Sequence, residues 1–153
     1  FHAFDHYISA KAFDDVSRHQ FASKAWLDHA DEVEHPLNDM LMMCYQTIIL
    51  NEEADGPNAY FEKAVLVDSA MDSDYYSRPE ELCARAFEAF VQDAAIKNNF
   101  LVKGTKESEE AKVGLYPQGE HRQRINQAFQ QYFSHLGASL KRLDAKQALA
   151  RDE

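Results

Sequence analysis

The most regular hydrophobic pattern in the chain lies between residues 75 and 93. At 100° per residue, apolar side chains cover almost the whole circumference of a helix here, and polar side chains fill one wedge of about 60°. The polar wedge contains Glu81, Arg85, Glu88 and Gln92. Ser77 is the expected N-cap, and Pro79 falls in the first turn. The pattern therefore predicts a largely buried helix with a charged stripe along one side.

The charged stripe of this helix needs partners, because an unpaired charge on a buried helix is costly. The spacing i, i+4 and i+7 allows a structural ladder in which Glu81, Arg85 and Glu88 pair with one another. The alternative is that the stripe binds something. The spacing alone leaves both interpretations open.

Helical periodicity also marks other segments of the chain. The predicted helices cover residues 1–13, 21–29, 37–50, 58–71 and 120–143. Residues 98–102 are expected to be extended, 104–114 to form a charged loop, and 144–153 to be a frayed tail. The predicted fold is all-α, a single compact domain of five to seven helices over residues 1–143, truncated at its N-terminus.

Two of these helices have predicted caps and faces. Asn38 or Asp39 is expected to cap the almost continuously apolar helix at 37–50, which should form the centre of the core. Asn58 is expected to cap the helix at 58–71. The side chains of that helix expected to face inward are Phe61, Ala64, Val65 and either Val67 or Ala70.

Composition limits the class of protein. A chain of 153 residues with 45% hydrophobic content is sufficient for one domain with a real core, and no segment is apolar enough to cross a membrane. The net charge of −10 argues against direct nucleic-acid binding. Cys44 and Cys83 both lie in apolar helical patterns, which favours buried, reduced thiols and a cytoplasmic location.

The first residues provide a candidate metal-binding pattern. His2 and His6 lie one helical turn apart, a spacing that can ligate a metal but that also occurs by chance on exposed faces. The chain has no initiating methionine and no signal-like start, so we expect it to begin inside a larger sequence or after a cut. It contains no nucleophile elbow, no glycine-rich phosphate loop and no CxxC pair.

Three separated motifs carry a family resemblance. The segments RPEELCARAFEAFVQD, NNFLVKGT and YPQGEHRQRINQAF occur in this order between residues 75 and 133. Together they resemble the first of the large polyvalent-protein-associated domains, which occur in multidomain proteins of phages and conjugative elements. The sequence upstream in that family typically resembles a zinc-peptidase helix of the form HExxHAxD. Here Phe1 to Asp5 match the end of that motif, while its first histidine and its glutamate would lie before Phe1.

The same segments are similar to zincin peptidases of the lethal-factor type, whose third metal ligand is a glutamate in a downstream ExxAEAF helix. Glu81 stands at that position in ELCARAF, and Arg85 replaces the second acidic residue of the family motif. A catalytic zinc takes three protein ligands and leaves a fourth position for water, on which a glutamate of the motif acts as general base. The resemblance therefore implies that His2 and Glu81 are two of the three zinc ligands.

The resemblance also implies roles for residues around the ligands. Asp5, Arg85 and Glu88 would contact and orient the metal ligands without binding the metal themselves. Tyr75 or Tyr76 would donate a hydrogen bond to the developing oxyanion, although both tyrosines could equally be packed at the entrance of the helix.

Two hypotheses about function follow, and both place the chain in the cytoplasm of a bacterial cell or deliver it into one. In the first, the chain is an incomplete zincin-like metallopeptidase domain of a phage or mobile-element protein, with zinc in the intact parent and a protein or peptide as substrate. In the second, it is a non-catalytic accessory module that binds a partner domain, and the stripe of Glu81, Arg85 and Glu88 is structural. The first hypothesis requires the helix that begins near Pro79 to bring Glu81 close to His2.

Overall fold

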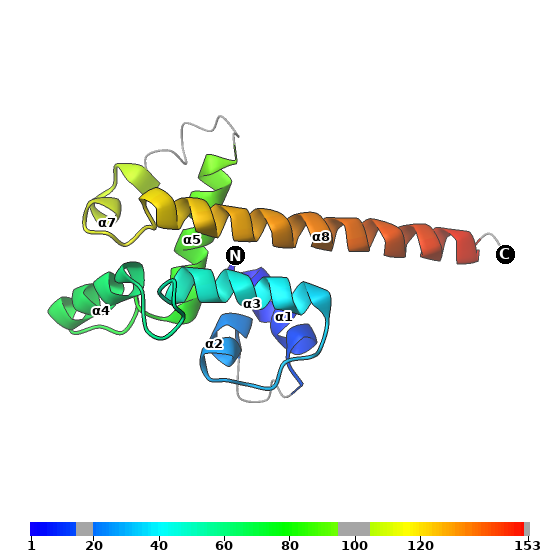
Figure 1. Ribbon diagram of the computed structural model, residues 1–153, viewed down its shortest axis with the longest axis horizontal. Helices are drawn as coiled ribbons and strands as arrows, with labels where there is room; N and C mark the ends of the chain where they lie inside the picture. The colour runs from blue at the N-terminus through cyan, green and yellow to red at the C-terminus, as the bar shows by residue number, and fades with distance from the viewer. Residues whose placement is uncertain (15–19, 95–104, 152–153) are drawn as a thin grey trace.

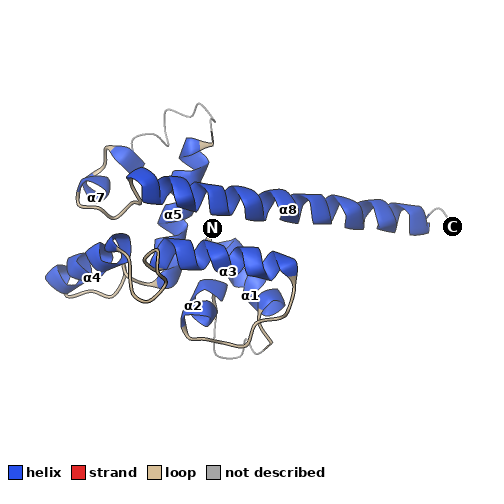
Figure 2. Ribbon diagram, viewed as in Figure 1, coloured by secondary structure: helices blue, strands red, loops and turns tan. Residues whose placement is uncertain are grey.

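The computed structural model describes residues 1–14, 20–94 and 105–151. Over these ranges the chain forms helices and no strand, which confirms the predicted all-α class (Figure 2). The helices are α1 (His2–Ala12), α2 (Ala22–Leu27), α3 (Pro36–Ile49), α4 (Ala59–Met71), α5 (Pro79–Asp93), α7 (Glu109–Lys112) and α8 (Gly119–Arg151). The segment at 98–102, which we expected to be extended, lies outside the described residues.

Helices α3 and α8 lie side by side and run in opposite directions (Figure 1). Helix α5 crosses both of them, and α2 contacts α3 and α5. Helix α1 packs against α2 and α5 and reaches α8 through Phe4, while α4 lies beyond the end of α3. The core contains Tyr45, Ile48, Leu82, Phe129 and Tyr132, all almost completely buried. Helix α3 therefore lies at the centre of the core, as its continuous apolar pattern predicted.

Two of the predicted N-caps are wrong, and one is confirmed. Helix α3 begins at Pro36 with His35 as its cap, and the His35 ring accepts a hydrogen bond from the backbone N–H of Leu37. Helix α5 is capped by Arg78, without a side-chain hydrogen bond. The predicted cap Ser77 instead donates its hydroxyl to Asp68. Asn58 caps α4 as predicted, because its side chain accepts from the N–H of Phe61.

Helix α4 turns most of the expected face inward, because Ala64 is buried and Phe61 and Val67 are partly buried against the core. Its buried residues are Tyr60, Ala64 and Asp68, whereas Val65 is 42% exposed. Tyr60 is held inside because its hydroxyl donates a hydrogen bond to the carbonyl oxygen of Leu82 on α5. A buried hydroxyl or carboxylate with hydrogen-bond partners is tolerated in a core, so Tyr60 and Asp68 can be buried at positions that the hydrophobic pattern did not select.

Two further segments differ from the sequence expectation. The charged stretch 104–114 contains a short helix, α7, capped by the Ser108 hydroxyl. Helix α8 continues to Arg151, beyond the predicted end at residue 143. No helix of the described residues is long and apolar enough to cross a membrane.

Candidate functional site

His2 and Glu81 meet at the contact between α1 and α5. The Nε2 atom of His2 lies 2.8 Å from Oε1 of Glu81, although the two residues are 79 positions apart in the sequence. The Glu81 side chain is 14% exposed and the His2 side chain 44% exposed. This confirms the expected geometry, in which the helix that begins at Pro79 lies against the N-terminal helix and brings Glu81 to His2.

The turn that precedes α5 is held in place by hydrogen bonds to Asp68. Asp68 on α4 accepts hydrogen bonds from the backbone N–H groups of Tyr76 and Ser77 and from the hydroxyl groups of Ser73 and Ser77. Burial raises the pKa of Asp68, but these hydrogen bonds, led by the one from the Ser77 hydroxyl, offset burial and leave the pKa lowered. The carboxylate therefore acts as an anchor for the turn that precedes Pro79. Glu81 then falls in the first turn of α5, where the helix dipole favours a negative charge.

A cavity of about 420 Å³ lies beside Glu81 and is lined by most of the site residues that the sequence predicted. Five predicted residues line it, namely Tyr75, Tyr76, Glu81, Arg85 and Glu88. The remaining lining residues are Ala84, Ser108, Glu110 and Tyr116. The fold thus gathers the predicted tyrosines and the charged stripe of α5 around one hollow.

The stripe does not form the ladder that its spacing allowed. Arg85 donates from Nε to the carbonyl oxygen of Leu115 at 2.7 Å and from Nη2 to the carbonyl oxygen of Tyr76 at 2.6 Å. Its guanidinium also lies 5.4 Å from the centre of the Tyr76 ring. Arg85 therefore joins α5 to the two loops on either side of the cavity, rather than pairing with an acidic neighbour along the helix.

Glu88 has a partner that the sequence did not reveal. The hydroxyl of Tyr116 donates a hydrogen bond to Glu88 Oε2 at 2.9 Å. Burial, followed by this hydrogen bond, raises the pKa of Tyr116, so the hydroxyl keeps its proton and remains a donor. No local pattern in the sequence connects Tyr116 with a residue 28 positions earlier.

The two tyrosines before α5 occupy different environments. Tyr75 is 48% exposed, and a hydrogen bond to Glu81, followed by desolvation, raises its pKa. Tyr76 is partly buried and packs against the core. The rings meet edge to face, with centroids 5.2 Å apart. Tyr75 is therefore the tyrosine that interacts with Glu81, whereas Tyr76 contributes packing to the cavity wall.

Asp5 lies on α1, one turn after His2, and is completely buried. It accepts hydrogen bonds from the backbone N–H of Ser23, the Ser23 hydroxyl and the Tyr45 hydroxyl. Burial raises its pKa, while these hydrogen bonds and the charge of nearby His2 act in the opposite direction. Asp5 therefore fixes the position of α1 against α2 and α3, and with it the position of His2.

The histidine pair of α1 does not converge on one point. His6 Nδ1 lies 2.8 Å from the carbonyl oxygen of Gln20, whereas His2 faces Glu81. Within the described ranges, no group of three or more His, Cys, Asp or Glu side chains is placed to hold a metal ion. An imidazole nitrogen and a carboxylate oxygen are normal zinc donors, so His2 and Glu81 fit two of the three positions of a catalytic zinc.

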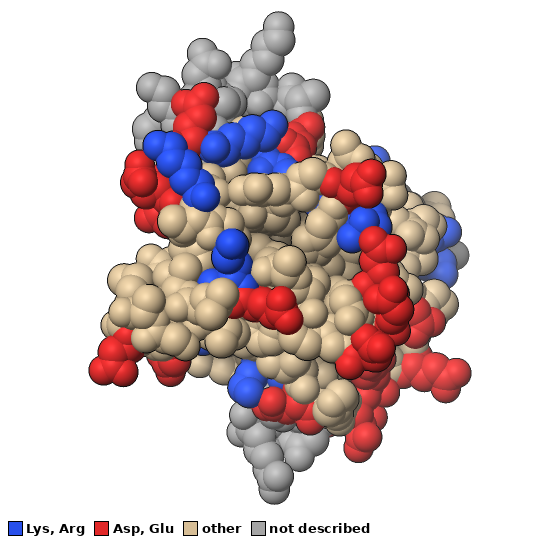
Figure 3. Space-filling view, turned by 60° about the vertical axis from the view of Figure 1, so that its left-hand side comes forward, with Lys and Arg blue, Asp and Glu red and all other residues tan. Residues whose placement is uncertain are grey.

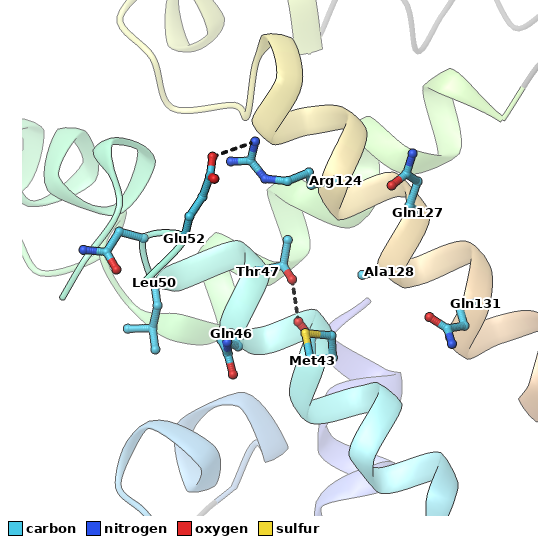
Figure 4. A pocket seen from close by; sticks show the side chains of 10 residues that line it. Met43, Gln46, Thr47, Leu50, Glu52, Arg124, Gln127, Ala128 and Gln131 are labelled. Atoms are coloured by element: carbon cyan, nitrogen blue, oxygen red, sulfur yellow. Dashed lines mark hydrogen bonds and ion pairs between the residues drawn. The ribbon is translucent and has the colours of Figure 1, made fainter. Parts of the chain in front are cut away.

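A second cavity, of about 430 Å³, lies between α3 and α8 (Figure 4). Its charged residues, Arg124 and Glu52, pair with each other across 3.1 Å. Gln46, Gln127 and Gln131 provide most of the remaining polar lining. None of the candidate site residues lies there, and its charges are satisfied by their own ion pair.

The comparisons with known proteins agree with part of the sequence resemblance. Residues 67–140 match the model of the family described as large polyvalent protein-associated domain 1. This range includes α5, the cavity and most of α8, but not His2. No curated protein and no solved structure matches the chain.

Proposed function

We propose that this chain carries part of a zincin-like metallopeptidase domain of a phage or mobile-element polyvalent protein, with His2 and Glu81 as two of its metal donors. The observation that carries the proposal is the 2.8 Å approach of His2 Nε2 to Glu81 Oε1. Residues so far apart in the sequence meet where the family resemblance requires two ligands to meet. The match of residues 67–140 supports the family context of Glu81.

The surroundings of the pair suit a hydrolytic site. Zinc bound there would lower the pKa of a water molecule and polarise a peptide carbonyl group. Tyr75 has its hydroxyl at Glu81 and a raised pKa, so it can donate a hydrogen bond to an oxygen that becomes negative. Asp5 fixes the helix that carries His2. The adjoining cavity of about 420 Å³ is large enough for one or two side chains of a peptide.

The residues present do not supply every catalytic role. A zincin needs a third ligand and a general base, and the structure places no further His, Cys, Asp or Glu group with the pair in the ranges it describes. We therefore expect residues 1–153 alone to hydrolyse no peptide bond, because general acid–base help is commonly worth about 10² to 10⁴ in rate.

A second candidate function is a non-catalytic accessory or interaction module. The hydrogen bonds of Arg85 favour it, because they join α5 to the carbonyl oxygens of Tyr76 and Leu115. In this function the charged stripe holds the loops of the cavity in place, and Glu81 and His2 form an ordinary ion pair. The partner would then be another domain of the parent protein.

Zinc titration separates the two candidates. We expect the 153-residue chain to bind zinc weakly, and both His2→Ala and Glu81→Gln to weaken binding by about tenfold or more, whereas His6→Ala does not. Adding His-Glu-Phe before Phe1 would place a histidine one turn before His2, and it should strengthen zinc binding through a third donor. If zinc affinity is the same in all four variants, the pair is structural and the accessory function is correct.

A further inference from the structure

The C-terminal part of α8 extends away from the other helices (Figure 1). We define the arm as residues 136–151, which at 1.5 Å per residue is about 24 Å long. Every residue from 140 to 151 is exposed. The arm lies mostly beyond the family match, which ends at residue 140. It is therefore a separate feature from the cavity at Glu81.

The arm carries an apolar stripe that continues the buried face of α8. Leu136, Leu140 and Leu143 fall within about 60° of one another at 100° per residue. Leu140 is 52% exposed and Leu143 is 50% exposed. Apolar residues at alternating spacings of four and three positions are the pattern with which one helix packs along another. Phe133, one turn before Leu136, already packs this way against the body.

Charge is distributed unevenly between the arm and the surface beside its base. Residues 25–39, which lead into the first turn of α3, contain five acidic residues and no lysine or arginine. Over residues 136–151 the arm is basic, with the four cations Lys141, Arg142, Lys146 and Arg151 against the single acidic residue Asp144, and Asp152 and Glu153 follow it in the sequence. On the face shown in Figure 3, acidic side chains gather in a band down one side.

The acidic segment reaches the base of the arm. Helix α3 runs in the opposite direction to α8, so its first turn lies where the arm leaves the body (Figure 1). Glu34 and Asp39, at this end of α3, are both exposed. If a second helix packed antiparallel against the arm, the C-terminal end of that helix would lie beside these two carboxylates.

We propose that the occupant of the arm is a second copy of this chain, with the two arms packed antiparallel. The apolar stripes would then cover each other, and Lys146 and Arg151 of each arm would lie toward Glu34 and Asp39 of the other copy. A two-fold axis makes both contacts occur twice, so one surface serves both copies. Complementary charge sets the direction of pairing, because parallel arms would keep their basic ends together and far from the acidic segment.

The arm provides its own controls. Lys146 and Arg151 flank the stripe, at about 80° and 60° from Leu136 on the helical wheel, whereas Lys141 and Leu149 point to the opposite side. Leu149 is an exposed leucine of the same arm, at 69% against 52% for Leu140, and therefore serves as a control of the same residue type.

Sedimentation equilibrium of the whole chain over a wide concentration range tests the pairing. We expect the wild-type mass to rise from 17.5 kDa toward twice that value. Leu140→Glu should weaken association by about a hundredfold, since the dimer loses two buried leucines and gains two buried charges. Leu149→Glu should leave association unchanged. A wild-type chain that remains monomeric, or equal effects of the two variants, would overturn the proposal.

Charge reversal tests the direction of the arms. Changing Glu34 and Asp39 together to lysine should weaken association about tenfold at low salt, and adding Lys146→Glu and Arg151→Glu should restore it. Lys141→Glu is the control and should have little effect. If the lysine variant associates as well as the wild type while Leu140→Glu dissociates, the arms do not pair antiparallel and the proposal is wrong.

Discussion

Arg85 and Glu81 lie one turn apart on α5 but have different surroundings. Substituting each of them should therefore change the free energy of unfolding by a different amount. Arg85 is 8% exposed and donates to two backbone carbonyl groups. Arg85→Ala leaves both carbonyl oxygens without this partner, and we expect a loss of about 3 kcal/mol or more in the free energy of unfolding. Glu81→Gln keeps the shape of the side chain and should cost less than about 1 kcal/mol.

Urea unfolding with a chelator present measures both variants without a contribution from metal. Glu88→Gln is a useful comparison, because the glutamine can still accept a hydrogen bond from Tyr116. Equal and large losses for Arg85→Ala and Glu81→Gln would place Glu81 in the same structural network as Arg85.

Between elements, a partly buried ion pair joins the end of α5 to α8, beside the aromatic contacts of Phe87 and Phe90 with α8. Arg122 on α8 is buried and donates from Nε and Nη2 to the two carboxylate oxygens of Asp93, at 2.6 and 3.0 Å. Partial burial raises the pKa of Asp93, but the hydrogen bonds from Arg122 and Asn126 offset it and lower the pKa to about 2. The ionised carboxylate therefore fixes the end of α5 against α8.

The lowered pKa of Asp93 predicts how stability depends on pH. The folded-state pKa lies below the usual 3.8, so the stabilisation is complete above about pH 4 and is lost as the pH falls toward 2. At pH 7 Asp93→Asn should cost about 2 kcal/mol, and near pH 2 the difference from wild type should be small. Unfolding by urea at several pH values provides the test. A difference that does not change with pH would show that the carboxylate is not ionised in this contact.

At the scale of the whole molecule, the two cysteines report on opening of the core. Cys44 and Cys83 are free and almost completely buried, as their apolar patterns predicted. Burial raises the pKa of Cys44 to about 12 and also raises that of Cys83. We expect neither thiol to react with a chromogenic disulfide reagent until the domain unfolds, because the thiolate is the reactive form.

Reaction of both thiols should therefore follow the unfolding transition as the urea concentration increases. The urea concentration at its midpoint should equal the midpoint measured by circular dichroism. Cys44→Ala and Cys83→Ala variants assign the signal to each thiol. Fast reaction of one thiol under native conditions would reveal local opening around that residue instead of opening of the whole core.

The sequence by itself determined the features that depend on local periodicity and residue type. The helical class, the buried α5 with its charged stripe, the Asn58 cap and the buried cysteines all follow from the spacing of apolar residues or from the chemistry of one side chain. The order of motifs also indicated the family that residues 67–140 match. These features need no knowledge of which helices are neighbours in space.

Only the tertiary structure decided which groups satisfy one another. Ser77 donates a hydrogen bond to Asp68 instead of capping a helix. Arg85 donates to two loop carbonyl groups, and Glu88 accepts a hydrogen bond from Tyr116. A buried polar group accepts whichever partner the packed helices bring within hydrogen-bond distance, and helical spacing describes only the partners on its own helix. His2 and Glu81 meet for the same reason, because the packing of α1 against α5 brings them together across 79 positions of sequence.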